Sequence, residues 1–327
     1  MIWIDTRWQG RHGIGRYARE VTERLTVPWH PLALDGSPAS PISALARVPK
    51  GLIYSPGYNG FLRAQRQVLT VHDLIHLETP WPERAKYVAY YNAVVKPIVK
   101  RSGVVLTVSE TSRDAIRDWL GDDRVEVVNA GLGSSPAFRS NVAPADASDP
   151  YLMYVGNLRA HKNLGVVLDA LRFVPEARLR MLIPSAEHDE ARGQFAERGI
   201  SDRIELLSGL SDGELAAQYR GAAATVMPSK IEGFGLPPLE SLMTGTPVIF
   251  WRGCTAVAET VGDRGWAIDR ADEAEGWAQA IREALSSPVR VGPPTRAYDW
   301  DATAGMIDTV LRQVIEERPH RRSRGSL

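Results

Sequence analysis

The sequence predicts an α/β protein made of two doubly wound, Rossmann-like domains. Short apolar runs rich in β-branched residues alternate with segments of helical periodicity along the chain. One polar, proline-bearing stretch, residues 134–150, interrupts this alternation and has the composition of a linker. The length of 327 residues corresponds to about two domains. Strands that alternate with crossover helices form parallel sheets, so we expect one such sheet in each half.

The first half contains apolar runs of strand length, separated by amphipathic segments. We place a first domain at residues 1–143. Residues 28–66 are rich in Pro, Gly and Ser and fit neither pattern. The expected strands are residues 1–5, 51–54, 68–71, 103–108 and 125–128, and the expected helices are residues 15–25, 82–100 and 110–120.

The second half repeats the alternation more regularly, and we place a second domain at residues 144–299. A breaker at residues 287–295 precedes a last helix at residues 302–317. Sheets of this kind bind ligands outside the carboxyl ends of their strands. The expected strands are residues 151–155, 179–183, 204–207, 223–227, 247–250 and 266–268.

Composition excludes several classes of protein. Lys+Arg and Asp+Glu both number 39, so the net charge is zero and a general polyanion binder is not expected. Cys254 is the single cysteine, which excludes an internal disulfide, and no Cys/His spacing resembles a zinc site. No apolar run approaches the ~18 residues of a spanning helix, and the N-terminus turns acidic at Asp5, too early for a signal peptide. We therefore expect a cytoplasmic protein.

The most informative motif is Pro-Ser-Lys-Ile-Glu-Gly-Phe-Gly-Leu-Pro-Pro-Leu-Glu at residues 228–240, between an expected strand and a helix. Its glycines allow a ligand to approach the backbone, and its prolines suit the first turn of a helix. The N–H groups that begin a helix bind anions. Glu232 and Glu240 are charged acceptors for hydroxyl groups, one facing the sugar and the other the ribose of a ligand. The alternative is a capped helix with two solvated glutamates, but the ordered Gly-Phe-Gly-Leu-Pro between them favours a ligand site.

A second motif, Val-Gly-Asn-Leu-Arg-Ala-His-Lys-Asn-Leu at residues 155–164, follows the first strand of the second half. A Rossmann-like sheet presents phosphate ligands at this position. Arg159 and Lys162 are cations that could offset negative charge on a leaving diphosphate. The alternative is a solvated loop.

These motifs resemble those of the retaining glycosyltransferases of family GT4. The E-x7-E pattern of that family is matched from Glu232 to Glu240, and residues 209–215 and 245–249 are also similar to it. The resemblance implies the GT-B fold, in which two Rossmann-like domains face each other across a cleft. It also implies that the N-terminal domain binds the acceptor, that the C-terminal domain binds the nucleotide-sugar donor, and that the C-terminal helix, residues 300–327, packs back on the first domain.

The resemblance also implies roles for single residues. Glu232 would hold hydroxyls of the donor sugar and Glu240 the ribose. Lys162 would contact the phosphates, and whether Arg159 or His161 supplies the second phosphate contact stays open. The backbone groups of the donor site would come from Gly156, Phe234, Gly235 and Leu236.

A glycine-rich loop near the N-terminus allows two interpretations. Gly13, Gly15 and Ala18 match the G-x-G-x-x-A dinucleotide fingerprint, and Asp35 lies where a ribose-binding acid would be. That fingerprint needs a tight turn directly after the strand, whereas residues 6–12 intervene here. We prefer the glycine-rich loop of GT4 enzymes, in which Gly13, Gly15 and the nearby Arg16 would contact the donor phosphate.

Histidines 72 and 76 are four residues apart, as in H-E-x-x-H zinc sites. That motif needs a helix to place both rings on one face, whereas residues 70–76 end a strand, so no metal site is expected. The resemblance places His72 near the donor sugar. Asp73 is interpreted as a structural partner of its own loop.

Two further motifs are interpreted as helix caps. Ser109 precedes the helix at 110–120, and the D-x-D triplet Asp299–Asp301 precedes the last helix. The chemistry is therefore expected to need no metal and no cofactor besides the nucleotide-sugar substrate.

A basic and aromatic segment contains Arg84, Lys86, Lys96, Lys100 and Arg101 together with Tyr87, Tyr90 and Tyr91. One interpretation is a solvated helix; the other is docking on anionic lipid near a lipid-linked acceptor. The tail adds Arg318, Arg321, Arg322 and Arg324.

The sequence thus predicts a retaining hexosyltransferase that moves a sugar from a nucleotide diphosphate to a hydroxyl of a glycan or lipid-linked acceptor. The relatives that it resembles build bacterial surface polysaccharides such as lipopolysaccharide, which favours a mannosyltransferase with a GDP-mannose-like donor. UDP- and dTDP-sugars stay open. No side chain stands out as a nucleophile, which favours departure of the phosphate from the face that the acceptor attacks. A sugar-nucleotide epimerase and a non-catalytic sugar-nucleotide-binding relative are the alternatives.

Overall fold

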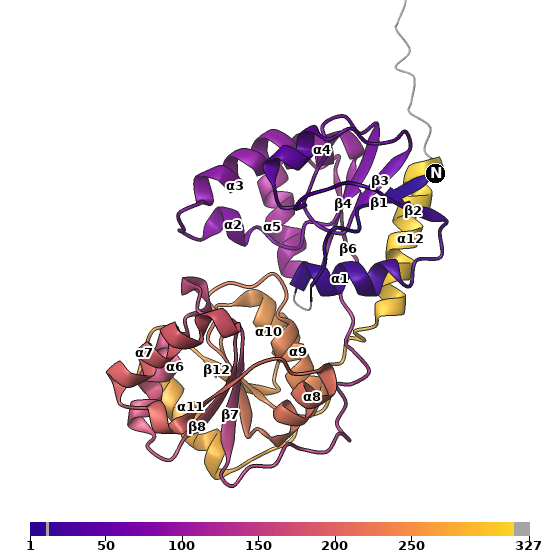
Figure 1. Cartoon of the computed structure of the whole chain (residues 1–327). Helices are drawn as coiled ribbons and strands as arrows, with labels where there is room; N and C mark the ends of the chain where they lie inside the picture. The colour runs from indigo at the N-terminus through magenta and orange to yellow at the C-terminus, as the bar shows by residue number, and fades with distance from the viewer. Residues whose placement is uncertain (11–12, 317–327) are drawn as a thin grey trace, which may run out of the picture. The chain divides into compact units, whose positions relative to one another are not determined.

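The computed structural model describes residues 1–10 and 13–316 and divides the chain into two compact units. Unit 1 combines Met1–Gly133 with Tyr298–Leu327, and unit 2 is Ser134–Ala297 (Figure 1). The sequence placed this division at residue 144. The division falls earlier because Phe138 packs against Tyr151 and Tyr219 in the core of unit 2.

The sheet of unit 1 is parallel, with the strand order β2-β1-β3-β4, and a bridge between Thr70 and Leu106 continues it to the pair β5-β6. All five strands expected in this half are confirmed within a few residues. Strand β2 was missed because it is a three-residue edge strand that ends in a proline and has no buried residue. The strands are β1 (Ile2–Ile4), β2 (Trp29–Pro31), β3 (Leu52–Ser55), β4 (Arg66–Leu69), β5 (Val104–Thr107) and β6 (Glu126–Asn129).

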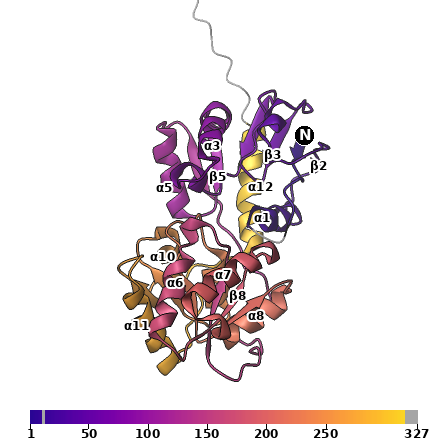
Figure 2. The same ribbon diagram turned by 60° about the vertical axis from the view of Figure 1, so that its left-hand side comes forward.

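The C-terminal helix of the chain packs on unit 1, as predicted. It runs beside the first helix (Figure 2), and the Asp308 carboxylate accepts hydrogen bonds from the backbone N–H groups of Thr26 and Val27 at 2.8 and 3.2 Å. The helices are α1 (Gly13–Thr22), α2 (Ile75–Glu78), α3 (Arg84–Tyr90), α4 (Lys96–Ser102), α5 (Glu110–Leu120) and α12 (Trp300–Glu316).

Helices α3 and α4 are joined by a π-helical turn, Tyr91–Val95, within the helix expected at residues 82–100. Pro97 has no N–H for an α-helical hydrogen bond, and its ring crowds the preceding turn. The wider turn accommodates the ring, because the Lys96 N–H bonds to the carbonyl of Tyr91, five residues earlier.

Unit 2 is a parallel sheet with the strand order β12-β11-β10-β7-β8-β9, as in a dinucleotide-binding fold. All six strands expected in this half are confirmed. They are β7 (Tyr151–Val155), β8 (Arg178–Leu182), β9 (Ile204–Leu207), β10 (Ala224–Met227), β11 (Val248–Trp251) and β12 (Gly265–Ile268).

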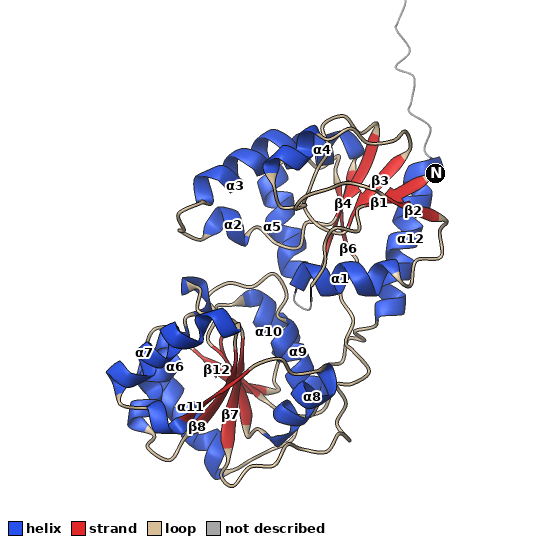
Figure 3. Cartoon of the chain, viewed as in Figure 1, coloured by secondary structure: helices blue, strands red, loops and turns tan. Residues whose placement is uncertain are grey.

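Helices cover both faces of this sheet (Figure 3). On one face, the core is built around the buried Trp277 together with Val167, Leu179 and Phe195. Across the described residues, no helix is long and apolar enough to cross a membrane. One face carries α6 (Leu164–Ala170), α7 (His188–Arg198) and α11 (Ala274–Ser286), and the other α8 (Asp212–Gly221), α9 (Leu236–Met243) and α10 (Thr255–Val261).

Candidate functional site

The order of the strands in unit 2 defines where a ligand can enter the sheet. Strand β7 pairs with β8 on one side and with β10 on the other, so the chain reverses its direction of winding between β7 and β10. Loops 156–163 and 228–235 leave the carboxyl ends of these two neighbouring strands. Open α/β sheets bind their ligands at such a switch point. The two motifs that the sequence singled out therefore lie side by side.

An ion pair joins the two loops. The Lys162 Nζ lies 2.6 Å from the Glu232 Oε1, and the two side chains are 16% and 9% exposed. The backbone N–H of Lys230 donates to the carbonyl of His161 at 2.8 Å, which fixes one loop to the other. Lys162 and Glu232 are thus held as a mostly buried pair at the mouth of the switch point.

Left-handed backbone conformations shape both loops. Gly235 has φ 95° at the N-cap of α9, a conformation that favours glycine. Asn163 has φ 51° before α6, and its amide Nδ2 donates to the carbonyl of Ala271 at 3.0 Å. The turn at Gly235 starts the eight-residue helix α9 at the predicted donor site, with Leu236 as its first residue.

The loop after β7 is fixed by a carboxylate from the next crossover. Glu187 accepts a hydrogen bond from the backbone N–H of Leu158 at 2.7 Å. The Arg159 guanidinium is exposed and makes no hydrogen bond within the described residues. It is therefore available to a ligand. Gly156 packs against the ring of Tyr154, because a Cβ at this position would lie 2.7 Å from the Tyr154 Oη.

Glu240 and Phe234 are both buried, at 4% and 6% exposure. The Tyr219 hydroxyl donates to the Glu240 Oε2 at 3.2 Å. A ribose hydroxyl that reached Glu240 would therefore share this carboxylate with a tyrosine. The Phe234 side chain is buried, so a contact of this residue with a donor would be made through its backbone, as the resemblance implies.

Cys254 is a neighbour of the site that no sequence motif indicated. Its thiol is buried within reach of the backbone of Glu232. Burial, together with the negative charge of Glu232, raises the pKa of this thiol to about 12. Cys254 therefore stays a neutral thiol that packs under the Glu232 loop. Only its position after β11, another strand of the same sheet, could have indicated it.

In unit 1, Gly13, Gly15 and Arg16 of the predicted glycine-rich loop lie in the first turn of α1. Gly15 lies against the preceding loop, because a Cβ there would come within 2.7 Å of the backbone of Gln9. Gly13 has φ 47° with open space around it, and Arg16 is buried. Packing alone thus accounts for Gly15, and phosphate contacts of Gly13, Gly15 and Arg16 remain predictions.

His72 is half-buried at the end of β4. Its Nε2 donates to the carbonyl of Pro56 at 2.9 Å, and its ring meets the edge of Tyr17 with centroids 4.6 Å apart. Burial lowers the pKa of His72 below its usual 6.5, against the opposing effects of the Pro56 hydrogen bond and the Asp73 charge. The ring is therefore neutral near pH 7. The Asp73 carboxylate accepts from the backbone N–H of Ile75, which agrees with its interpretation as a loop partner.

The two predicted helix caps are confirmed. The Ser109 hydroxyl accepts from the backbone N–H of Ser112, and Asp299 accepts from that of Asp301 at the start of α12. Among the described residues, no group of three His, Cys, Asp or Glu side chains could hold a metal ion. His76 instead stacks on Tyr87 with centroids 4.6 Å apart.

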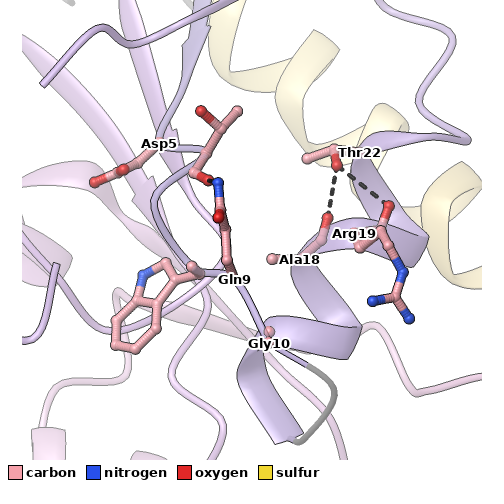
Figure 4. A pocket seen from close by; sticks show the side chains of 9 residues that line it. Asp5, Gln9, Gly10, Ala18, Arg19 and Thr22 are labelled. Atoms are coloured by element: carbon pink, nitrogen blue, oxygen red, sulfur yellow. Dashed lines mark hydrogen bonds between the residues drawn. The ribbon is translucent and has the colours of Figure 1, made fainter. Parts of the chain in front are cut away.

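Unit 1 also contains a cavity of about 370 Å³ between the loop after β1 and helix α1 (Figure 4). A buried polar network fixes its wall. The Asp5 carboxylate accepts from the Arg7 guanidinium at 2.7 and 2.9 Å and from the Asn59 amide at 2.6 Å, and Trp8 donates to Asn59. The cavity is lined by Asp5, Thr6, Trp8, Gln9, Gly10, Gly15, Ala18, Arg19 and Thr22.

Residues 84–101 do not form the single basic and aromatic surface that one of the two interpretations of this segment requires. Tyr90 and Tyr91 are buried in the core of unit 1. The Lys96 ammonium donates to the carbonyl of Trp119 at 2.5 Å, and Lys100 pairs with Asp122 at 3.6 Å. A helix that is in contact with the core on one side cannot present all these residues on one surface. The arginines of the tail, residues 318–324, lie outside the described residues.

Residues 138–300 match the family described as Glycosyl transferases group 1. The O-antigen chain mannosyltransferase B of Escherichia coli is 31% identical over 241 residues, which cover 68% of this chain and 62% of that protein. The D-inositol 3-phosphate glycosyltransferase of Corynebacterium glutamicum (strain R) is 28% identical over 240 residues, 65% of this chain and 57% of that protein. The chain thus spans about six-tenths of the length of these curated relatives.

Solved structures show the same fold at low sequence identity. The sucrose-phosphate synthase of Thermosynechococcus elongatus has a TM-score of 0.60 at 19% identity and covers 81% of this chain and 69% of its own. The Anabaena protein HepE, solved with UDP and glucose, has a TM-score of 0.53 at 18% identity. The match covers 80% of this chain and 76% of that protein. The predicted GT-B fold, with two Rossmann-like units, is thereby confirmed. Residues 138–300 of this chain thus match the glycosyl transferases group 1 family.

Proposed function

We propose that this protein is a retaining glycosyltransferase that transfers a hexose from a nucleotide-diphosphate sugar to an acceptor hydroxyl. The observation that carries the proposal is the Lys162–Glu232 pair at the switch point of the unit 2 sheet. A cation and a carboxylate fixed 2.6 Å apart offer one group for a phosphate and one for a sugar hydroxyl. The match of residues 138–300 to the group 1 family supports the same reaction class.

The chemistry proposed for the site is stabilisation of a leaving diphosphate. When a donor binds, its phosphate competes with Glu232 for the Lys162 ammonium, which frees the carboxylate to accept from sugar hydroxyls. Arg159 adds a second, exposed cation, and the N–H groups that begin α9 add dipoles of the same sign. The departing phosphate takes the proton of the acceptor hydroxyl, so the new glycosidic bond forms on the face that the phosphate leaves. No metal takes part in this scheme.

For the donor, we propose a GDP-mannose-like nucleotide sugar. The support is the names of two relatives, O-antigen chain mannosyltransferase B of Escherichia coli and O-antigen chain mannosyltransferase RfbU of Salmonella typhimurium. The Anabaena neighbour was solved with UDP and glucose, which makes a UDP-sugar the second candidate.

For the acceptor, we propose a hydroxyl of a glycan or lipid-linked glycan, bound by unit 1 on the cytoplasmic side of the membrane. The cavity beside α1 is the feature of unit 1 that supports this assignment, because its wall is fixed by the Asp5 network before any ligand binds. The substitution Ala18→Leu narrows the cavity and should raise the KM for the acceptor without changing donor hydrolysis.

The experiment that tests the function is incubation of the protein with GDP-, UDP- and dTDP-hexoses, with and without an acceptor glycan. We expect slow hydrolysis of one donor alone, faster consumption with acceptor, and a product with the anomeric configuration of the donor. Conversion of a donor into its epimer without acceptor would instead identify an epimerase. Binding without turnover would identify a non-catalytic relative, and the absence of any nucleotide affinity by calorimetry would refute all three.

A further inference from the structure

Unit 1 exposes three large apolar side chains on two adjoining segments. Ile42, Leu45 and Leu62 are 76%, 60% and 41% exposed. Ile42 and Leu45 lie three residues apart in the 3₁₀ helix Pro41–Leu45, so their side chains point to the same side. The backbone N–H of Leu62 donates to the carbonyl of Ala44 at 2.9 Å, which brings Leu62 to this helix.

The other side of these segments is anchored in unit 1. Ala44 and Phe61 are buried at 2% and 0% exposure. The Ser43 hydroxyl donates to the carbonyl of Ser37 at 2.9 Å and accepts from the Arg7 guanidinium at 3.2 Å. The two segments that carry the three apolar side chains are therefore held in place by the rest of unit 1, and the side chains themselves are exposed to solvent.

The segments that carry these side chains are basic in sequence. Residues 36–72 contain four cations and no acid. Arg47 and Arg63 are exposed and form no ion pair within the described residues. Arg101 adjoins the same segment, because its guanidinium donates to the carbonyl of Ala64 at 3.4 Å. Asp35 directly precedes this acid-free stretch in the sequence and is exposed. We call Ile42, Leu45, Leu62, Arg47, Arg63 and Arg101 the basic apolar patch.

We infer that the basic apolar patch docks unit 1 on an anionic lipid bilayer. Apolar side chains among cations fit the interface of such a bilayer, because the apolar groups enter the acyl boundary while the cations meet the lipid phosphates. The paired tyrosines and lysines of residues 84–101 do not offer this combination, whereas the patch does. Docking does not rest on the proposed reaction and can be measured without any donor.

The test is co-sedimentation of the full chain with vesicles of equal parts phosphatidylcholine and phosphatidylglycerol. We expect binding at low salt that weakens as salt increases, and none to pure phosphatidylcholine. The triple substitution Ile42→Ser, Leu45→Ser and Leu62→Ser should weaken binding about tenfold or more. Each of Arg47→Gln and Arg63→Gln should weaken it about fivefold.

Two controls separate the patch from other sources of binding. The pair Arg172→Gln and Phe173→Ser removes a cation and a 49% exposed apolar side chain from unit 2 and should leave binding unchanged. A full chain with Arg318, Arg321, Arg322 and Arg324 changed to Gln measures what the tail contributes.

Three results would overturn the inference. They are no vesicle binding by the unmodified chain, equal binding by the triple variant, and self-association by sedimentation velocity that the triple substitution abolishes. The last result would assign the patch to a second copy of the chain. Circular dichroism of the triple variant should match the unmodified chain, because the three side chains are solvent-exposed.

Discussion

The two units differ in how the residues that follow the carboxyl ends of their parallel strands are paired. In unit 2, the loops after β7 and β10 bring a lysine and a glutamate together and leave an exposed arginine beside them. In unit 1, the residues at the same ends of β1 and β4 are already paired with their own unit. Asp5 is held by Arg7 and Asn59, and His72 is held by Pro56 and Tyr17.

The two arrangements correspond to two ways of building a binding site, one with paired charges and one with a fixed wall. Unit 2 holds opposite charges in a pair that a charged ligand can divide, because a phosphate competes for the lysine and hydroxyl groups for the carboxylate. Unit 1 uses its buried charge to fix the wall of an open cavity. Charge in unit 2 should therefore govern turnover, and charge in unit 1 should govern stability.

The largest expected effect is on turnover in unit 2. Lys162→Ala should lower kcat by about 10²–10³-fold, as loss of a charge that stabilises a leaving group does. Lys230→Ala is the matched control, because Lys230 lies on the same loop as Glu232 but pairs with Asp272 at 2.7 Å on the exposed rim. Its kcat should change less than about threefold, since exposed ion pairs contribute little. Steady-state kinetics with the best donor measures both; equal loss in the two variants would contradict the role of Lys162.

In unit 1, the corresponding substitution should act on stability. Asp5→Asn keeps the shape of the side chain but removes the charge that faces the Arg7 guanidinium, whose side chain is only 10% exposed. We expect a loss of about 3 kcal/mol in the free energy of unfolding, because one buried charge is left without its partner. Urea denaturation measures it. A loss below about 0.5 kcal/mol would show that the network does not fix the wall.

Much of this comparison could be predicted from the sequence. Strand periodicity located the eleven expected strands, and the order Gly-Phe-Gly-Leu-Pro between Glu232 and Glu240 located the loop that faces Lys162. Local chemistry determined these features, because a turn, a strand and a helix start depend on neighbours in the chain.

The rest depended on contacts between residues far apart in the sequence. Cys254 lies under Glu232 only because β11 is placed beside β10, and Tyr219 meets Glu240 across helices α8 and α9. Tyr90 and Tyr91 looked like surface residues by composition and proved to be core residues. No local pattern states which face of a helix the rest of the fold will cover.

Two glycines at the start of α1 in unit 1 should have a smaller effect, which is on the free energy of unfolding. Gly15→Ala places a Cβ within 2.7 Å of the backbone of Gln9, whereas Gly13→Ala meets no atom within 4 Å. We expect Gly15→Ala to cost about 2 kcal/mol of stability through overpacking, and Gly13→Ala to cost less, about 1 kcal/mol, because of its positive φ. Thermal unfolding ranks the two variants. Equal losses would show that Gly15 is not selected by packing.

The smallest expected effect is a pH dependence that arises from His72. Burial lowers the pKa of His72 in the folded state below the 6.5 of an unfolded chain, so the unfolded state binds a proton first as the pH falls. The free energy of unfolding should therefore decrease as the pH drops from 7.5 through 6.5 toward the lower folded value. In His72→Gln, the amide can still donate to Pro56 but does not titrate, so this part of the slope should disappear. Denaturation curves at closely spaced pH values measure the difference, with His30→Gln on the partly exposed strand β2 as a control that should keep the slope. A slope unchanged in His72→Gln would mean that the ring is solvated in the folded state, and the neutral, fixed character assigned to this end of unit 1 would then be wrong.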